Sequence, residues 1–283
     1  MKKFSFFTKN NDLSFLLKEA FHIGSRLISS VKGNRIAFLL LPFFLAGTIS
    51  CGNDKNSTSK TYYESGRLER EETYKNGKLE GLFKNYYEDG GLRSEGTFKN
   101  DKVEGISKEY YKSGGLQLEL MYKNGSQDGL CKSYYEDGGL RLELMYKNGG
   151  RDGLFKNYYE DGVLQSEGSF KDDKQDGVSK EYYKSGPLQS KLTYKIGSKE
   201  GLCKSYYEDG GLRLELMYKN GGRDGLFKNY YEDGALQSEG SFKDDKLDGK
   251  FKLYGESGEI IYIDTYKDGE KVSRLIYDEK GGV

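Results

Sequence analysis

Residues 83–96 read FKNYYEDGGLRSEG, and nearly the same fourteen residues return at 155–168 and at 227–240. A shorter period runs through them, because a Tyr pair recurs every 24 residues from 62–63 to 230–231. Self-similarity at a fixed period of this length is the signature of a repeat architecture. We therefore predict nine 24-residue units over residues 59–272, followed by a half-repeat C-terminal cap at 273–283.

Each unit reads as a β-hairpin. Residues 82–87 and 92–98 are short, rich in aromatic or β-branched types, and separated by Glu-Asp-Gly-Gly. Asp-Gly favours a two-residue hairpin turn, in which both turn positions take positive φ, so we place the turn at Asp89-Gly90. The turn glycines of the nine units are then Gly66, Gly90, Gly114, Gly138, Gly162, Gly186, Gly210, Gly234 and Gly258.

This turn sets which residues face each other across the hairpin. Lys84 lies opposite Glu95, and opposite charges placed in this way stabilise a strand pair. Among the first eight units only Lys180 and Lys191 break the pattern. The other expected pairs are Lys60–Glu71, Lys108–Glu119, Lys132–Glu143, Lys156–Glu167, Lys204–Glu215 and Lys228–Glu239.

Side-chain size supports the same register. Phe83 falls opposite Gly96, and units with Ser or Cys in place of Phe have Leu opposite. Large meets small in all seven cases, as close packing of directly opposed side chains requires. The remaining pairs are Phe155–Gly168, Phe227–Gly240, Ser107–Leu120, Cys131–Leu144, Ser179–Leu192 and Cys203–Leu216.

Asn-Gly pairs, such as Asn76-Gly77, supply the turns between hairpins, so the meander continues without changing faces. We predict an all-β fold: an elongated single-layer antiparallel meander or solenoid of about nine 24-residue β-hairpin repeats. One face should carry Leu79, Phe83, Asn85, Tyr87, Leu92, Gly96 and Phe98. The other face should carry Lys84, Tyr86, Arg93, Glu95, Thr97 and Lys99.

The N-terminal region is different in kind. Residues 36–50 form an uncharged apolar run of fifteen residues, which is short for a membrane span but follows Lys32 and Arg35 in the order of a secretory signal. We predict a signal peptide over 1–50, with a true start near 27–31, and a polar tether over 51–58. The residues before Cys51 resemble a bacterial lipobox, which implies cleavage between Ser50 and Cys51 and lipid attachment to Cys51. An ordinary cleaved signal and an uncleaved anchor remain as alternatives.

Composition argues against several classes of function. The formal net charge is zero, and beyond residue 50 the chain holds 38 basic and 43 acidic residues, so it has no electrostatic footprint for nucleic acid. The single His is His22, inside the predicted signal. Cys131 and Cys203 occupy equivalent positions three units apart, too far for an intramolecular disulfide, and read as small apolar fillers. The repeated Glu-Asp pairs read as turn chemistry. We therefore expect a non-enzyme with no catalytic residues, no metal site and no cofactor.

The first Tyr of each pair is the candidate for function. These residues should form a ladder on the charged face, either packed over Arg93 or Gln117 or offered to a protein or glycan partner, since exposed Tyr is enriched in interfaces. The second Tyr of each pair should lie in the core. The ladder consists of Tyr86, Tyr110, Tyr134, Tyr158, Tyr182, Tyr206 and Tyr230.

The stretches EGTFKNDKVEGISKEYYKSGGLQ (95–117) and SEGSFKDDKQDGVSKEYYKSGPLQ (166–189) resemble the MORN-repeat family in its bacterial variant form. At three turns the usual Gly of that family is replaced by Asp101, Asp173 and Asp245. The resemblance implies a curved β-hairpin ribbon that serves as an interaction or membrane-proximal scaffold, and some bacterial relatives are antitoxin components. We therefore expect a scaffold for an unknown protein partner at the bacterial envelope, at the outer membrane or cell surface, and held to the membrane by the N-terminal lipid. The alternatives are an antitoxin-like inhibitor of a toxin and, less favoured, a glycan-binding wall protein.

Overall fold

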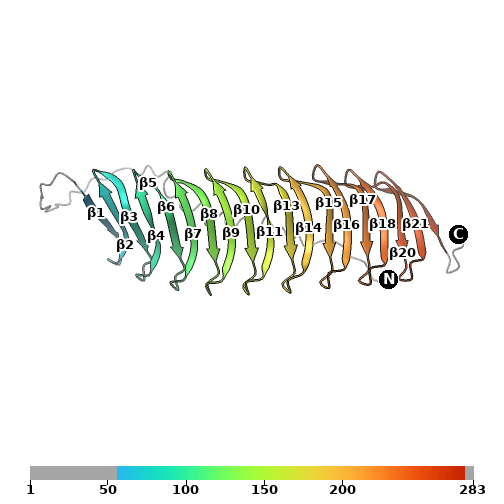
Figure 1. The fold of residues 1–283 in the computed structure, drawn as a ribbon, viewed down its shortest axis with the longest axis horizontal. Coiled ribbons are helices and arrows are strands. Elements are labelled where there is room, and N and C mark those ends of the chain that lie inside the picture. Colours follow the sequence, from blue (N-terminus) through green and yellow to red (C-terminus); the bar gives the residue numbers. More distant parts are fainter. Residues whose placement is uncertain (1–55, 278–283) are drawn as a thin grey trace. The chain divides into compact units, whose positions relative to one another are not determined.

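The computed structural model describes residues 56–277, which form a row of β-hairpins that follow one another in sequence order (Figure 1). The chain divides into two units, Met1–Cys51 and Gly52–Val283, of which the first lies outside the described residues. The signal peptide, its cleavage site and Cys51 are therefore predictions outside the described part of the chain. Over residues 56–277 the chain contains no helix that is long and apolar enough to cross a membrane.

All described strands belong to one antiparallel sheet in which each hairpin pairs with the next. This confirms the predicted all-β meander of hairpin repeats. The strands are β1 (Asn56–Tyr62), β2 (Leu68–Lys75), β3 (Lys78–Tyr86), β4 (Leu92–Lys99), β5 (Lys102–Val103), β6 (Gly105–Tyr110), β7 (Leu116–Lys123), β8 (Ser126–Tyr134), β9 (Leu140–Lys147), β10 (Gly150–Tyr158), β11 (Leu164–Lys171), β12 (Lys174–Gln175), β13 (Gly177–Tyr182), β14 (Leu188–Lys195), β15 (Ser198–Tyr206), β16 (Leu212–Lys219), β17 (Gly222–Tyr230), β18 (Leu236–Lys243), β19 (Lys246–Leu247), β20 (Gly249–Tyr254), β21 (Ile260–Lys267) and β22 (Glu270–Ile276).

Two boundaries differ from the prediction. Strand β1 begins at Asn56, inside the segment 51–58 that we expected to be a tether, because pairing with β2 orders its polar residues. Strand β22 pairs with β21 from Glu270 and ends at Ile276, so the last strand starts before the predicted cap at 273–283.

The predicted register across each hairpin is confirmed, but the predicted loop is wrong. Lys84 pairs with Glu95 and Phe83 pairs with Gly96. The carbonyl of Tyr87 accepts a hydrogen bond from the N–H of Gly90 at 2.9 Å, while the N–H of Tyr87 donates to the Gly91 carbonyl at 2.8 Å. Residues 88–90 thus form a three-residue loop in which only Gly90 has positive φ, at +96°. Such a loop is a type I turn followed by one left-handed residue.

A β-bulge beside this loop exchanges two side chains between the faces of the sheet. Asn85 pairs with Ser94, but Tyr86 pairs with Leu92, which leaves Arg93 as the extra residue. Because directly opposed residues share a face, Leu92 lies with Tyr86, and Arg93 turns to the other side. Our assignment of Leu92 and Arg93 to faces was therefore wrong.

The turns between hairpins have the predicted form. Asn76 and Gly77 have φ of +52° and +79°, and Tyr74 pairs with Leu79 across them. Asp173 occupies the glycine position of the equivalent turn four repeats along, with φ of +65°. Its N–H donates to the carbonyl of Arg151 at 3.0 Å, and its carboxylate accepts from the N–H of Arg151 at 2.9 Å. The second of these bonds is one that Gly could not make, and it accounts for Asp at a position that costs conformational strain.

The apolar face, defined as the side that carries Phe83 and Phe155, holds the core. Phe155 and Leu144 are each 1% exposed. A Cβ atom on Gly168 would lie 2.7 Å from Cε1 of Phe155, so the ring fills the space that a side chain there would need. Close packing on the apolar face therefore requires a small residue opposite each large one.

An ion pair covers the C-terminal end of the row of buried residues on the apolar face. Asp264 follows Gly240 by one repeat and is 1% exposed. Arg274 donates to both of its carboxylate oxygens, at 2.6 and 2.7 Å, and lies 3.9 Å from the ring centroid of Tyr262. These hydrogen bonds hold the pKa of Asp264 below its usual value. End repeats of a solenoid need polar groups where a neighbour is missing, and this pair supplies them.

The second Tyr of each pair ties one hairpin to the next. The hydroxyl of Tyr87 donates to the carbonyl of Tyr110 at 2.7 Å, and the hydroxyl of Tyr135 donates to that of Tyr158 at 2.6 Å. Eight such bonds, from 2.6 to 3.0 Å, run along the described hairpins. These side chains are half-buried, so they link repeats as well as pack in the core.

Candidate interaction surface

The charged face, defined as the side that carries Lys84 and Glu95, has three parallel rows of side chains. The first is a Lys/Glu ladder with one residue on each successive full-length strand. From Lys84 to Lys156, and again at Lys228, each Lys faces an acid across its own hairpin and another across the junction with the neighbouring hairpin. Glu143 lies between Lys132 and Lys156 in this way. Ion-pair distances run from 2.8 to 3.8 Å.

The second row is the predicted Tyr ladder, and four of its seven hydroxyls donate to carboxylates of the first row. Tyr110 donates to Oε1 of Glu95 at 2.7 Å, and burial together with this bond raises the pKa of Tyr110 to about 12. The phenol therefore stays a donor at neutral pH. Four further Tyr–Glu bonds of the same kind are Tyr158–Glu143, Tyr182–Glu167, Tyr230–Glu215 and Tyr254–Glu239, at 2.9–3.1 Å.

The expected packing of these Tyr rings over Arg93 or Gln117 is wrong, and their contact with a partner stays a prediction. The rings are half-buried. Tyr86 lies opposite Leu92 and Tyr110 opposite Leu116, while the bulge turns Arg93 and Gln117 to the apolar face. The Tyr row is thus flanked by Leu, four of its seven members are hydrogen-bonded to Glu, and part of each half-buried ring remains exposed.

The third row, which the sequence reading missed, consists of exposed apolar side chains. On the adjacent strands β6 to β10 it is formed by Ile106, Met121, Leu130, Met145 and Leu154, which are 47, 41, 39, 36 and 67% exposed. We call these five residues the apolar row. Soluble proteins rarely expose a contiguous line of this kind without a binding role. For Ile106, Leu130 and Leu154 the signal was present in the sequence as an apolar residue directly before the position equivalent to Phe83.

Each methionine of the apolar row lies against a glycine of the neighbouring strand. Gly153 has φ of +118°, and a Cβ atom there would lie 2.7 Å from Cβ of Met145. Gly129 stands in the same relation to Met121, at 2.9 Å from its Cγ. Glycine at these two positions leaves room for the Met side chains, which remain exposed.

The Glu-Asp loops along one edge of the sheet behave as turn chemistry. The carboxylate of Asp89 accepts from the N–H of Gly91 at 3.1 Å, and this hydrogen bond lowers the pKa of Asp89. Asp137 and Asp209 repeat the bond to Gly139 and Gly211 at 2.8 Å. All nine predicted turn glycines, from Gly66 to Gly258, have positive φ.

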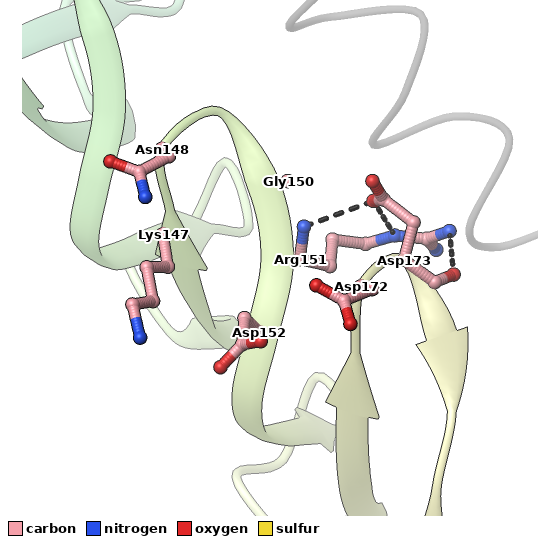
Figure 2. Close-up of a pocket in the computed structure, with 7 residues that line it drawn as sticks. All are labelled: Lys147, Asn148, Gly150, Arg151, Asp152, Asp172 and Asp173. Carbon is pink, nitrogen blue, oxygen red and sulfur yellow. Dashed lines mark hydrogen bonds and ion pairs between the residues drawn. The ribbon is translucent and has the colours of Figure 1, made fainter. Parts of the chain in front are cut away.

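The opposite edge has a polar groove between two successive turns (Figure 2). It is lined by Lys147, Asn148, Gly150, Arg151, Asp152, Asp172 and Asp173. Arg151 donates to the carboxylate and the carbonyl of Asp173, as the dashed lines show, and its guanidinium lies 4.4 Å from the ring centroid of Phe170. Within residues 56–277 no group of His, Cys, Asp and Glu has the arrangement needed to hold a metal ion.

The two described cysteines are poor candidates for chemistry. Cys131 is 5% exposed and faces Leu144, and burial raises the pKa of its thiol to about 12. Burial raises the pKa of Cys203 as well. Thiolate is the reactive form, so both side chains stay protonated and unreactive at neutral pH.

The model of the MORN repeat variant matches the chain nine times, at residues 55–76, 79–100, 103–124, 127–148, 151–172, 175–195, 199–220, 223–244 and 247–268. The chain belongs to the MORN repeat variant family. Each match covers one hairpin, so the family repeat and the structural repeat coincide. This MORN repeat protein is thus a repeat scaffold, with β22 as an additional strand after the ninth match.

Among solved structures, the MORN repeat chain is similar to part of a crystal structure of TcdB2-TccC3-Cdc42, at 14% identity over 75% of this chain and 15% of that one, with a TM-score of 0.17. A crystal structure of TcdB2-TccC3 gives 13% identity, 75% and 16% coverage, and a TM-score of 0.16. The chain spans about one sixth of the length of these structures. No curated protein sequence matches it.

Proposed function

We propose that this protein is a non-enzymatic scaffold, exported to a bacterial envelope and anchored by lipid at Cys51, whose charged face binds a protein partner. The observation that carries the proposal is the apolar row, five exposed hydrophobic side chains on five adjacent strands. Their neighbours in the Lys/Glu ladder neutralise each other, so a partner can bury the row without leaving a block of unpaired charge.

The environment of the polar groups supports a binding role over catalysis. Active sites hold groups in single, asymmetric surroundings, whereas the carboxylates of the ladder recur with the same Lys and Tyr partners. Glu167 and Glu239 have lowered pKa values for the same reason, a hydrogen bond from Lys followed by one from Tyr. Equivalent sites of this kind suit a surface that binds a partner across several repeats.

The experiment that tests the binding face is site-specific photo-crosslinking in the native cells. A photoreactive phenylalanine analogue replaces Leu154, which is 67% exposed in the apolar row, or, as the matched control, Glu136, which is exposed in a loop at the sheet edge. We expect an adduct of one defined mass from Leu154 and none from Glu136. An adduct from Glu136 alone would place the interface at the loop edge of the sheet and would contradict binding through the charged face.

Export and anchoring are tested separately. In cells that express the full chain, Cys51→Ser should move the protein from the membrane fraction to the soluble fraction. Protease added to intact cells should degrade it if it stands on the cell surface, and only after the outer envelope is opened if it faces the periplasm. Protection until the inner membrane is lysed would refute export and favour the antitoxin-like alternative.

A further inference from the structure

The Lys/Glu ladder is interrupted once between Lys60 and Lys252. Lys180 pairs with Lys191 across hairpin β13–β14, and Lys191 pairs with Lys204 across β14–β15. Three lysines thus stand side by side on the charged face, at strand spacing of about 4.8 Å. Like charges directly opposite one another destabilise a strand pair, so this arrangement lowers the stability of the sheet at β13–β15.

The acids that flank the three lysines do not compensate for the middle one. Glu167 forms an ion pair with Lys180 at 2.9 Å, and Glu215 forms one with Lys204 at 2.9 Å. The side chain of Lys191 is exposed, and within residues 56–277 its ammonium group has no hydrogen bond or ion pair. The five groups together carry one uncompensated positive charge.

The Tyr ladder has its matching gap at the same place. Elsewhere in the ladder the residue 15 positions before the Tyr is Glu, but before Tyr206 it is Lys191. The intact version of the arrangement is seen at Glu239, which accepts from Lys252 at 2.8 Å and from Tyr254 at 2.9 Å. At the corresponding place Lys204 and Tyr206 can still donate hydrogen bonds, but Lys191 stands where the accepting Glu would be.

The sequence of this unit has diverged from its counterpart while its neighbours have not. Residues 181–202 differ from 109–130 at seven of 22 positions, whereas the flanking blocks 131–177 and 203–249 differ at two of 47. One of the seven differences puts Lys191 in the place of Glu119. Another puts Ile196 at φ of +50° and 64% exposed, although a β-branched residue is a genuine outlier there. Departures from local rules are typical of functional sites.

Exposed apolar side chains lie beside the lysines. Val178 and Leu202 precede Lys180 and Lys204 by two residues on the same face, and they are 44 and 42% exposed. An anion that docks at Lys191 would therefore have hydrophobic surface within reach on both neighbouring strands. This combination suits a peptide segment better than a free inorganic anion, which gains nothing from the apolar contacts.

We propose that this break in the ladder is a docking site for an acidic, apolar peptide segment of a protein partner, one of whose carboxylates takes the place of the missing Glu. The carboxylate accepts from Lys191, Lys204 and Tyr206, and an adjacent apolar side chain covers Val178 and Leu202. The inference rests on the proposed function in that the partner is a protein. This site would fix the position along the ladder at which the partner binds, because the other repeats of the surface are equivalent to one another.

The test uses the full chain and a short fluorescein-labelled peptide that alternates Leu and Glu, with a Leu/Gln peptide for comparison. We expect fluorescence anisotropy to show tighter binding of the Glu peptide, with affinity that falls as salt is raised. Lys191→Glu restores the ladder and should weaken binding about tenfold or more. Equal binding of the two peptides, or no effect of Lys191→Glu, would overturn the proposal.

The chain provides its own matched control. Glu119→Lys added to Lys191→Glu breaks the ladder at the corresponding place three units earlier and should return the affinity to near that of the starting protein. Loss in Lys191→Glu without this return would also overturn the proposal, because other residues of the diverged unit would then be responsible. Circular dichroism verifies that both variants are folded. If the peptide fails while Leu154 still crosslinks to a partner in cells, this inference falls and the proposed function stands.

Discussion

The large–small rule of the core can be tested by moving one of the chain's own residue pairs to a new place. Phe155→Cys removes a ring that is 1% exposed and should cost about 3 kcal/mol of unfolding free energy. Gly168→Leu forces a side chain where even a Cβ atom would lie 2.7 Å from that ring, which should cost about 3 kcal/mol as well. The double variant recreates the pair Cys131–Leu144, which the structure already accommodates.

We therefore expect the double variant to unfold within about 1 kcal/mol of the starting protein, instead of the roughly 6 kcal/mol that independent effects would give. The assay is urea unfolding followed by circular dichroism and Tyr fluorescence at constant pH, with the slope of each transition compared to confirm that the same cooperative unit unfolds. Additive losses in the double variant would refute the reasoning, since the two side chains would then not share one space.

Three further variants test separate elements. Gly153→Ala should lower the unfolding free energy by about 2–3 kcal/mol in urea titrations, because it combines positive φ with a contact to Met145, whereas Gly138→Ala has open space around it and should lose only about 1 kcal/mol. Burial raises the pKa of Glu109 from 4.5 to about 7, so the folded state binds a proton more tightly than the unfolded state. The unfolding free energy should therefore fall by at most about 3 kcal/mol as pH rises from about 4.5 through 7. Glu109→Gln should abolish that fall in thermal melts at pH 5 and pH 8, and an unchanged pH profile would contradict the assignment. Tyr135→Phe removes a bond of 2.6 Å to the next repeat and should cost about 1 kcal/mol, whereas no change in the urea midpoint would mean that the bond adds nothing to the junction between repeats.

The hairpin register was predictable from the sequence because two independent properties agree on it. Charge places Lys84 opposite Glu95, and size places Phe83 opposite Gly96, and a slip of one residue would violate both. The turns between hairpins were predictable for a similar reason, since few residues other than Gly and Asn accept the positive φ seen at Asn76 and Gly77.

The loop and the bulge beside it were not predictable in the same way. Asp89-Gly90 fits a two-residue turn and also the end of a three-residue loop, and both keep the Lys–Glu and Phe–Gly pairs in register. The difference between them appears only at the last pair of the hairpin, where it decides which of Leu92 and Arg93 lies beside Tyr86. Because the bulge adds one residue to one strand, only the hydrogen-bond pattern reveals it.

By itself the sequence determined the repeat and the strand pairing, since these follow from period, side-chain size and charge. Tertiary structure decided which side chains remain available. Tyr110 donates its hydroxyl to Glu95 in the preceding hairpin, and its ring is half-buried. Leu154 looked like one more apolar strand residue until the sheet left it 67% exposed. Accessibility depends on which side chains neighbouring strands bring together, and the pattern within a single strand does not specify it.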